Sequence, residues 1–215
     1  MNTIITIARQ FGSGGREIGE KLANYYGIPY YDKNVLARVA RESGFCEEFL
    51  DTQDERPTGS FLYNLVMDTY AFGSSSFGVA DMPISQKVFL AQFNTIKKIA
   101  SEGPCVIIGR CADCALEDRD DTLSLFIHAD EEFRLHRLDT VERQRRNDIP
   151  DTPDKMREFL EQTDRQRQSY YNYYSMKKWG RSDTYDMTIN SGLFGIDNTV
   201  EMLKDVIARF EARKK

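Results

Sequence analysis

The sequence has 215 residues, and its 40% hydrophobic and 12% aromatic side chains provide enough apolar material for one sizeable core. Charged residues make up 29% and the formal net charge is −5, a balance that excludes a disordered acidic chain. No apolar run approaches the roughly 18 residues of a membrane-spanning helix, and the N-terminus has neither the basic segment nor the cleavage site of a signal peptide. We therefore expect one domain over residues 1–215, in the cytoplasm and with no membrane partner.

Five short apolar segments predict β-strands. The first, TIITIA, is a β-branched run of the kind found in strands that are buried on both faces. The five expected strands cover residues 3–8, 28–31, 105–108, 123–128 and 185–190.

Helical segments separate these strands. Within residues 85–102, apolar side chains recur at Phe89, Phe93 and Ile96, the spacing of one helix face. The expected helices cover residues 16–26, 33–41, 85–102, 130–146, 154–178 and 195–213. Strands that alternate with helices predict right-handed crossovers and a parallel sheet in an α/β fold. Such a sheet binds its ligands beyond the carboxyl ends of its strands.

The turn between the first strand and the first helix is rich in glycine. It reads RQFGSGGR and contains Gly12, Ser13, Gly14 and Gly15. Glycine lets backbone N–H groups approach a phosphate closely, and the helix N-terminus adds partial positive charge. The strict P-loop pattern G-x-x-x-x-G-K-[ST] is not met, because Gly15 stands where the lysine is expected.

The residue after Gly15 is the candidate for the missing cation. Arg16 carries a guanidinium group, which grips phosphate in a bidentate manner. The alternative is a tight turn that binds nothing, but the strand and helix on either side favour phosphate binding.

The four cysteines give little indication of a metal site. Cys111 and Cys114 form a C-x-x-C pair, but no second pair and no histidine pair completes a zinc site. We expect reduced, structural thiols, with a metal or redox role as the alternative and no metal ligands assigned.

Basic charge is concentrated in one part of the chain. Residues 131–181 contain 12 basic and 10 acidic residues, whereas the rest of the chain contains 17 basic and 24 acidic ones. A local basic excess in an acidic protein suits a small anionic ligand better than a long nucleic acid. We therefore expect no nucleic-acid partner.

Five segments together resemble the cytidylate kinase-like proteins, relatives of bacterial cytidylate kinase among the P-loop nucleoside monophosphate kinases. They are TIARQFGSGGREIGEKLA, PYYDKNVLARVA, CVIIGRCAD, LFIHADEEFRLHRL and DRQRQSYYNYYSMKKWG. The resemblance implies a three-layer α/β P-loop kinase fold with a five-stranded parallel sheet. It also implies an acceptor-binding insertion at about residues 42–84 and a helical lid at about residues 146–182.

The resemblance assigns residues to the two substrates. The loop residues Gly12 to Glu17 would bind ATP, with Arg16 as a catalytic group. Asp32 and Arg38 in YYDKNVLAR, and Arg110 in VIIGRC, would hold the acceptor.

The DRQR segment is similar to the family's lid motif. Arg165 and Arg167 would act as catalytic lid residues on the donor phosphates, with Asp164 beside them. Asp164 and Arg167 are three apart on a helix and share a face, so a solvated ion pair is the alternative reading.

The four tyrosines at positions 170, 171, 173 and 174 form two adjacent helical stripes. They predict either base stacking or, as is more common, packing of a long helix onto its domain.

The resulting hypothesis is a nucleoside monophosphate kinase that uses Mg²⁺ and moves the γ-phosphoryl group of ATP to CMP, dCMP or a similar acceptor. The alternative is a nucleotide-binding or regulatory protein of the same fold without turnover. That alternative is favoured by Gly15 in the lysine position and by Glu17, which stands where cytidylate kinases place a threonine near Mg²⁺. A nucleic-acid-binding protein is a further alternative, which the overall acidity disfavours.

Overall fold

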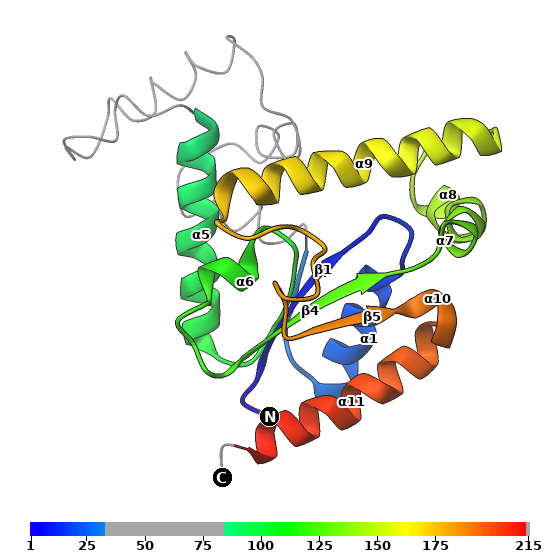
Figure 1. Cartoon of the computed structure of the whole chain (residues 1–215). Helices are drawn as coiled ribbons and strands as arrows, with labels where there is room; N and C mark the ends of the chain where they lie inside the picture. Colours follow the sequence, from blue (N-terminus) through cyan, green and yellow to red (C-terminus); the bar gives the residue numbers. More distant parts are fainter. Residues whose placement is uncertain (33–83, 214–215) are drawn as a thin grey trace.

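The computed structural model describes residues 1–32 and 84–213, which form a central sheet of five parallel strands (Figure 1). The strand order is β2-β3-β1-β4-β5. The strands are β1 (Ile4–Arg9), β2 (Tyr30–Tyr31), β3 (Val106–Ile108), β4 (Thr122–His128) and β5 (Met187–Asn190). All five expected strands are confirmed, with ends shifted by one or two residues, and the parallel pairing is the one that the alternation predicted.

Helices cover both faces of the sheet, which gives the three layers expected. On one face, α1 (Gly15–Tyr26) and α11 (Ile196–Ala212) pack Ile18 and Leu203 against Ile7 of the central strand. On the other face, α5 (Ile84–Glu102) and α6 (Ala112–Ala115) pack against Ile4 and Ile107. Neighbouring strand residues therefore point into different apolar layers, and both sides of the strands are buried.

A third group of helices lies at the carboxyl ends of the strands. It comprises α7 (Glu131–Arg137), a π-helical turn (Leu138–Glu142), α8 (Arg143–Arg145) and α9 (Pro153–Tyr174). Figure 1 shows α9 spanning from α5 to the region of α7 and α8. Its apolar side chains Met156 and Leu160 pack with Phe11 of the glycine-rich turn, so α9 forms a wall beside that turn.

Three expected helices differ in extent from the observed ones. The helix expected at 130–146 is broken by the π-helical turn, and the helix expected at 154–178 already ends at Tyr174. Ser175 is extended there and its hydroxyl donates to the Tyr171 carbonyl, which closes the helix end. The last helix is preceded by the short α10 (Ser191–Phe194).

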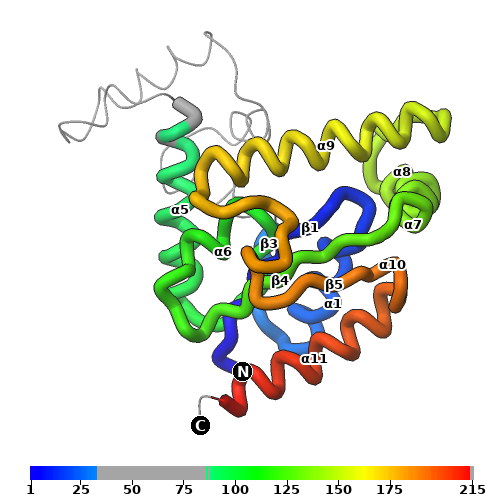
Figure 2. Tube along the Cα trace, in the orientation of Figure 1, coloured from blue at the N-terminus to red at the C-terminus, as the bar shows by residue number. Residues whose placement is uncertain are grey.

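The chain ends are tied together. The Thr3 hydroxyl donates to Oε1 of Glu211 on α11 at 3.0 Å, and Figure 2 shows the start of the chain beside the end of that helix. The helix expected at 33–41 and almost all of the insertion at 42–84 lie outside the described residues. None of the described helices is long and apolar enough to cross a membrane.

Candidate functional site

The glycine-rich turn connects the end of β1 to the start of α1. Gly12 and Gly14 have φ of 77° and 78°, a left-handed conformation that favours glycine. The buried Ser13 braces the turn, because its hydroxyl contacts the carbonyls of Gln10 at 2.9 Å and Ile127 at 3.1 Å. Ser13 therefore shapes the loop with its side chain, while Gly12, Gly14 and Gly15 face a cavity.

That cavity has a volume of about 640 Å³, which is in the range of small-molecule sites. It opens at the carboxyl ends of β1, β2 and β3, the edge where a parallel sheet binds ligands. Seven arginines and five carboxylates line it, so positive charge is in excess. The arginines are Arg9, Arg16, Arg110, Arg137, Arg145, Arg146 and Arg167.

Arg137 lies directly over the loop. Its side chain is 10% exposed, and a Cβ added to Gly14 would lie 3.4 Å from its guanidinium carbon. Nη2 donates to Oε2 of Glu17 at 2.7 Å, whereas Nε is buried and has no hydrogen-bond partner within residues 1–32 and 84–213. A buried N–H without an acceptor is costly, so this guanidinium is suited to an anion held at Gly14.

Glu17 is occupied by two cations. Besides Arg137, Lys21 lies 3.2 Å from its Oε1 atom. Burial alone would raise the pKa of Glu17, but the hydrogen bonds and charges of Arg137 and Lys21 together outweigh it, so that the pKa is lowered. Glu17 is therefore a carboxylate at neutral pH, at the position where the resemblance expected a threonine.

Arg16 lines the cavity but is directed towards the β2 side. Its Nε atom lies 3.0 Å from Oδ2 of Asp32, and 45% of its side chain is exposed. Asp32 itself is only 13% exposed and follows β2. The structure thus brings the donor-side candidate Arg16 together with the acceptor-side candidate Asp32.

Arg110 follows β3 in an unusual backbone conformation. Gly109, Arg110 and Cys111 have φ of 71°, 64° and 53°, so that three successive residues are left-handed. For the two non-glycine residues this conformation costs on the order of 1–2 kcal/mol each. Such strain is concentrated at functional sites, and here it places Arg110 at the cavity.

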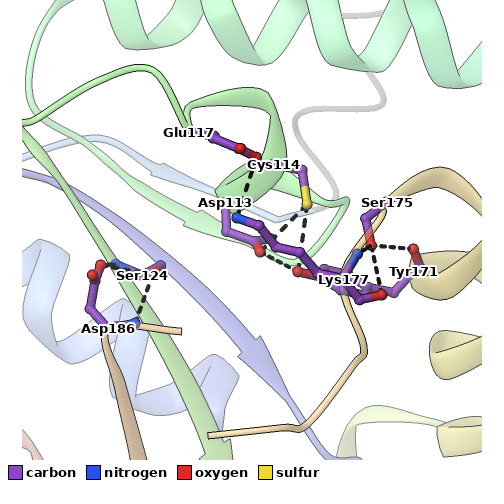
Figure 3. Close-up of polar contacts among 8 residues, drawn as sticks. All are labelled: Asp113, Cys114, Glu117, Ser124, Tyr171, Ser175, Lys177 and Asp186. Atoms are coloured by element: carbon purple, nitrogen blue, oxygen red, sulfur yellow. Dashed lines mark hydrogen bonds and ion pairs between the residues drawn. The ribbon is translucent and has the colours of Figure 1, made fainter. Parts of the chain in front are cut away.

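Figure 3 shows how α6, the helix that follows the Arg110 turn, is fastened to α9 through Asp113, Cys114 and Tyr171. The Tyr171 hydroxyl donates to Oδ2 of Asp113 at 2.5 Å, and Cys114 Sγ lies 3.5 Å from the same hydroxyl. Lys177 and Glu117 add an ion pair at 3.3 Å. Burial raises the pKa of Asp113 and raises that of Cys114 to about 11, so neither group is a ready nucleophile at neutral pH.

The predicted lid residues separate on two faces of α9. Asp164 accepts from the Phe11 N–H at 2.7 Å and pairs with Arg134 at 2.5 Å. Arg167 lines the cavity, and its Nη1 atom donates to the Arg9 carbonyl at 3.3 Å. Arg165 instead pairs with Glu161, with 74% of its side chain exposed, and it does not line the cavity.

The predicted roles of the tyrosines resolve mainly as packing. Tyr174 stacks on Phe89 with ring centres 4.1 Å apart, Tyr170 donates to Gln92, and Tyr171 is 4% exposed. Tyr173 is exposed. In the described part of the chain, no group of three or more His, Cys, Asp or Glu residues is arranged to hold a metal ion.

Sequence reasoning missed four of the seven arginines that line the cavity, namely Arg9, Arg137, Arg145 and Arg146. Arg137 lies in the segment LFIHADEEFRLHRL, which is part of the family resemblance, but the resemblance assigns it no role. Arg9 carried a signal, because it stands six residues before Gly15, where the strict P-loop pattern has its first glycine. The acceptor candidate Arg38 lies outside the described residues.

Comparison with known proteins identifies the family. A model of the cytidylate kinase-like family matches residues 4–193. The chain belongs to the cytidylate kinase-like family. This confirms the resemblance on which the residue assignments rest, and the family and its fold are those of kinase-like phosphotransferases.

Solved structures agree with this family assignment at the level of fold. An uncharacterized protein from Eubacterium ventriosum is 28% identical with a TM-score of 0.68, over 96% of this chain and 98% of that one. Shikimate kinase from Bacteroides thetaiotaomicron is 14% identical with a TM-score of 0.55, over 97% of this chain and 99% of that one, which shows a shared P-loop kinase fold alone. Curated proteins gave no significant match.

Proposed function

We propose that this cytidylate kinase-like chain is an ATP-dependent nucleotide kinase that transfers the γ-phosphoryl group to CMP, dCMP or a similar monophosphate. The observation that carries the proposal is Arg137, whose buried guanidinium lies over Gly14 with Nε lacking an acceptor in the described residues. Phosphoryl transfer needs positioning and charge neutralisation with little covalent help, and converging arginines supply both.

The donor half of the site is built on the loop. The backbone of Gly12 to Gly15 and the α1 N-terminus would hold the ATP phosphates. Arg137 would contact them from above, and Arg167 from α9. We assign the lid contact to Arg167 rather than Arg165, because only Arg167 lines the cavity.

The acceptor half follows β2 and β3. Arg110 would hold the monophosphate, and Arg16 with Asp32 would line the same side, 3.0 Å apart. An oxygen of the acceptor phosphate attacks the γ-phosphorus, and the bond from that phosphorus to its bridging oxygen breaks. Arg38, in the segment outside the described residues, would complete this half by family resemblance.

The residues of this site fit a Mg²⁺ ion that is held by the phosphates of a bound nucleotide rather than directly by protein side chains. Glu17 is the nearest side chain to the usual threonine position, but its oxygens are engaged by Arg137 and Lys21. Mg²⁺ commonly keeps several waters and binds through substrate phosphates, where it neutralises charge. We propose that phosphate oxygens and water hold the ion here, with no dedicated protein cage.

A second candidate function is nucleotide binding without turnover. It is supported by the loop itself, since Gly15 offers no lysine and Glu17 is locked in two ion pairs. In this case the cavity would bind ATP through its arginines, and the nucleotide-bound form would regulate another protein. The expected cytoplasmic location suits both candidates.

A coupled phosphotransfer assay distinguishes the candidates. The purified chain is incubated with ATP, Mg²⁺ and each nucleoside monophosphate in turn, with product ADP measured against an acceptor-free control. Turnover with CMP or dCMP above the others supports the proposal. Calorimetric binding of ATP and CMP without product supports the non-catalytic candidate, and turnover only with another acceptor class refutes the cytidylate assignment.

A further inference from the structure

Compared with the strict P-loop pattern, this loop has a glycine and a long basic residue in interchanged positions. When Gly14 and Gly15 are placed on the G-K positions of G-x-x-x-x-G-K-[ST], the first glycine falls on Arg9. A long basic side chain therefore stands where the pattern has none, and a glycine stands where the pattern has a long basic side chain.

The two positions are in direct contact, so the exchange is linked. A Cβ added to Gly15 would lie 2.7 Å from Cβ and 3.2 Å from Cγ of Arg9. The Cβ of Ile127, which pairs with Arg9 across β1 and β4, would be 3.3 Å away. Because 2.7 Å is closer than two such carbons can pack, the site accommodates a side chain at position 9 or at position 15, but not at both.

The Arg9 side chain runs from the loop to the Arg110 turn. Its Nη1 atom lies against Gly109, so closely that a Cβ on Gly109 would overlap it. Its Nη2 atom is 4.0 Å from Oδ1 of Asp32, and the side chain lines the cavity with 20% exposed. The guanidinium thus lies between the phosphate loop and the acceptor side, where a phosphoryl group would pass from one to the other.

Arg9 is also less exposed and more weakly paired than Arg16. Its backbone is part of the central strand, and its carbonyl accepts a hydrogen bond from Arg167 on α9. Arg16 is 45% exposed and pairs closely with Asp32, at 3.0 Å, whereas Arg9 is 4.0 Å from that carboxylate. A preorganised cation with a weak internal partner is better suited to stabilise charge that develops during transfer.

We propose that Arg9 is the phosphate-contacting catalytic residue that takes the role of the P-loop lysine, and that Gly15 is the residue that makes room for it. This inference rests on the proposed function and deepens it by naming the cation. It replaces Arg16, which the sequence alone suggested, and leaves Arg16 on the acceptor side.

A cycle of variants restores the usual arrangement and tests the exchange. The variants are Arg9→Gly, Gly15→Lys and the double Arg9→Gly/Gly15→Lys, with Arg16→Ala as the matched control. Turnover with ATP and the best acceptor is measured for each, and thermal unfolding verifies the fold. Arg9→Gly should lower kcat by roughly 10²-fold, as is typical for loss of one such donor.

The double variant is the decisive test of the proposal. It should turn over at least about ten times faster than Arg9→Gly, because its lysine supplies the missing charge. Gly15→Lys alone should unfold at a lower temperature than the double variant, since its side chain meets Arg9. Arg16→Ala should lose less kcat than Arg9→Gly. A folded double variant no faster than Arg9→Gly, or a larger kcat loss in Arg16→Ala, overturns the proposal.

Measurements of ATP binding test the inference independently of the proposed function. The affinity for ATP without acceptor is measured calorimetrically in the same variants. If the wild type binds ATP but phosphorylates no acceptor, the proposed function fails. The inference that Arg9 contacts phosphate in the lysine's place then stands if Arg9→Gly weakens ATP binding and the double variant recovers it, and it falls if not. Absence of ATP binding by the wild type overturns both.

Discussion

Asp164 joins three elements of the site, and its removal gives a sharp test of the structure. Its carboxylate accepts from the Phe11 N–H of the loop and pairs with Arg134 of α7, whose Nε also donates to the Phe11 carbonyl. The Asp164 and Arg134 side chains are 14% and 10% exposed. Asp164→Ala therefore leaves a buried guanidinium without its counter-charge and a loop N–H without its acceptor.

The magnitude follows from this burial. Removing one partner of a buried ion pair costs about 3–5 kcal/mol, and we take about 3 kcal/mol because Arg134 keeps its bond to Phe11. For a chain of this size that corresponds to a fall in Tm of roughly 6–12 °C. Burial raises the pKa of Asp164 despite the opposing charge of Arg134. The intact pair thus adds little net stability, although breaking it is costly.

Two further variants make the measurement specific. Arg165→Ala removes an exposed pair on a solvent-facing part of the same helix and should cost less than about 0.5 kcal/mol. Asp164→Asn keeps an oxygen for the Phe11 N–H and should fall between the two. Urea unfolding followed by circular dichroism gives the three free energies. If the free energy of unfolding of Asp164→Ala lies within about 1 kcal/mol of the wild-type value, the contacts of Asp164 with Phe11 and Arg134 do not hold α9 to the loop.

Three other predictions follow from the described contacts. Arg137→Ala should raise the Kd for ATP by roughly 10-fold or more, since a charge-assisted hydrogen bond is worth about 1.5–3 kcal/mol; equal calorimetric affinity in the folded variant would remove Arg137 from the donor site. The lowered pKa of Glu17 means that its stabilisation is present above its unfolded pKa of about 4.3 and is lost as pH falls through the lower folded value. The unfolding free energies of wild type and Glu17→Gln should therefore converge below about pH 4, and a constant gap from pH 7 to 3 would contradict this. Burial raises the pKa of Cys105 to about 12 and also raises that of Cys111, so both thiols should react with a thiol reagent at pH 8 only when the protein is unfolded; rapid labelling of either in the native state would show a different environment.

The sheet was predictable because its signal is local. Runs such as TIITIA and CVII are apolar and β-branched, and helical segments between them force parallel pairing. The π-helical turn at Leu138–Glu142 was not predictable, because it depends on tertiary packing. There Leu138 is fully buried against Phe11, and the Thr140 hydroxyl bonds the His136 carbonyl. A polar helical pattern carries no signal for this change to i→i+5 hydrogen bonding.

The site was predictable in its location and only partly in its residues. The glycine-rich turn, Arg110 and Arg167 were found because each follows a motif or strand end, and all face one cavity. The sequence grouped Arg165 with Arg167 as lid residues. In a helix, however, Arg165 points away from the face that Asp164 and Arg167 share. Arg137 required knowledge of which helix folds over Gly14, and that information lies in three-dimensional contacts rather than in spacing.

The contacts of α9 limit how a lid at residues 146–182 would work. Swinging this helix open would break the Asp164 bonds to Phe11 and Arg134, and would expose Leu160 from its cluster with Phe11. Both charges of the pair would then reach water, so the cost of opening comes mainly from exposing this apolar cluster and from losing the bond to the Phe11 N–H. Arg145 and Arg146 also line the cavity and precede α9, and the Arg146 guanidinium contacts the α9–loop cluster only over the rings of Phe11 and Phe159 among the contacts described. Closure over donor phosphates therefore fits that preceding segment better than α9, which would serve as the fixed wall carrying Arg167.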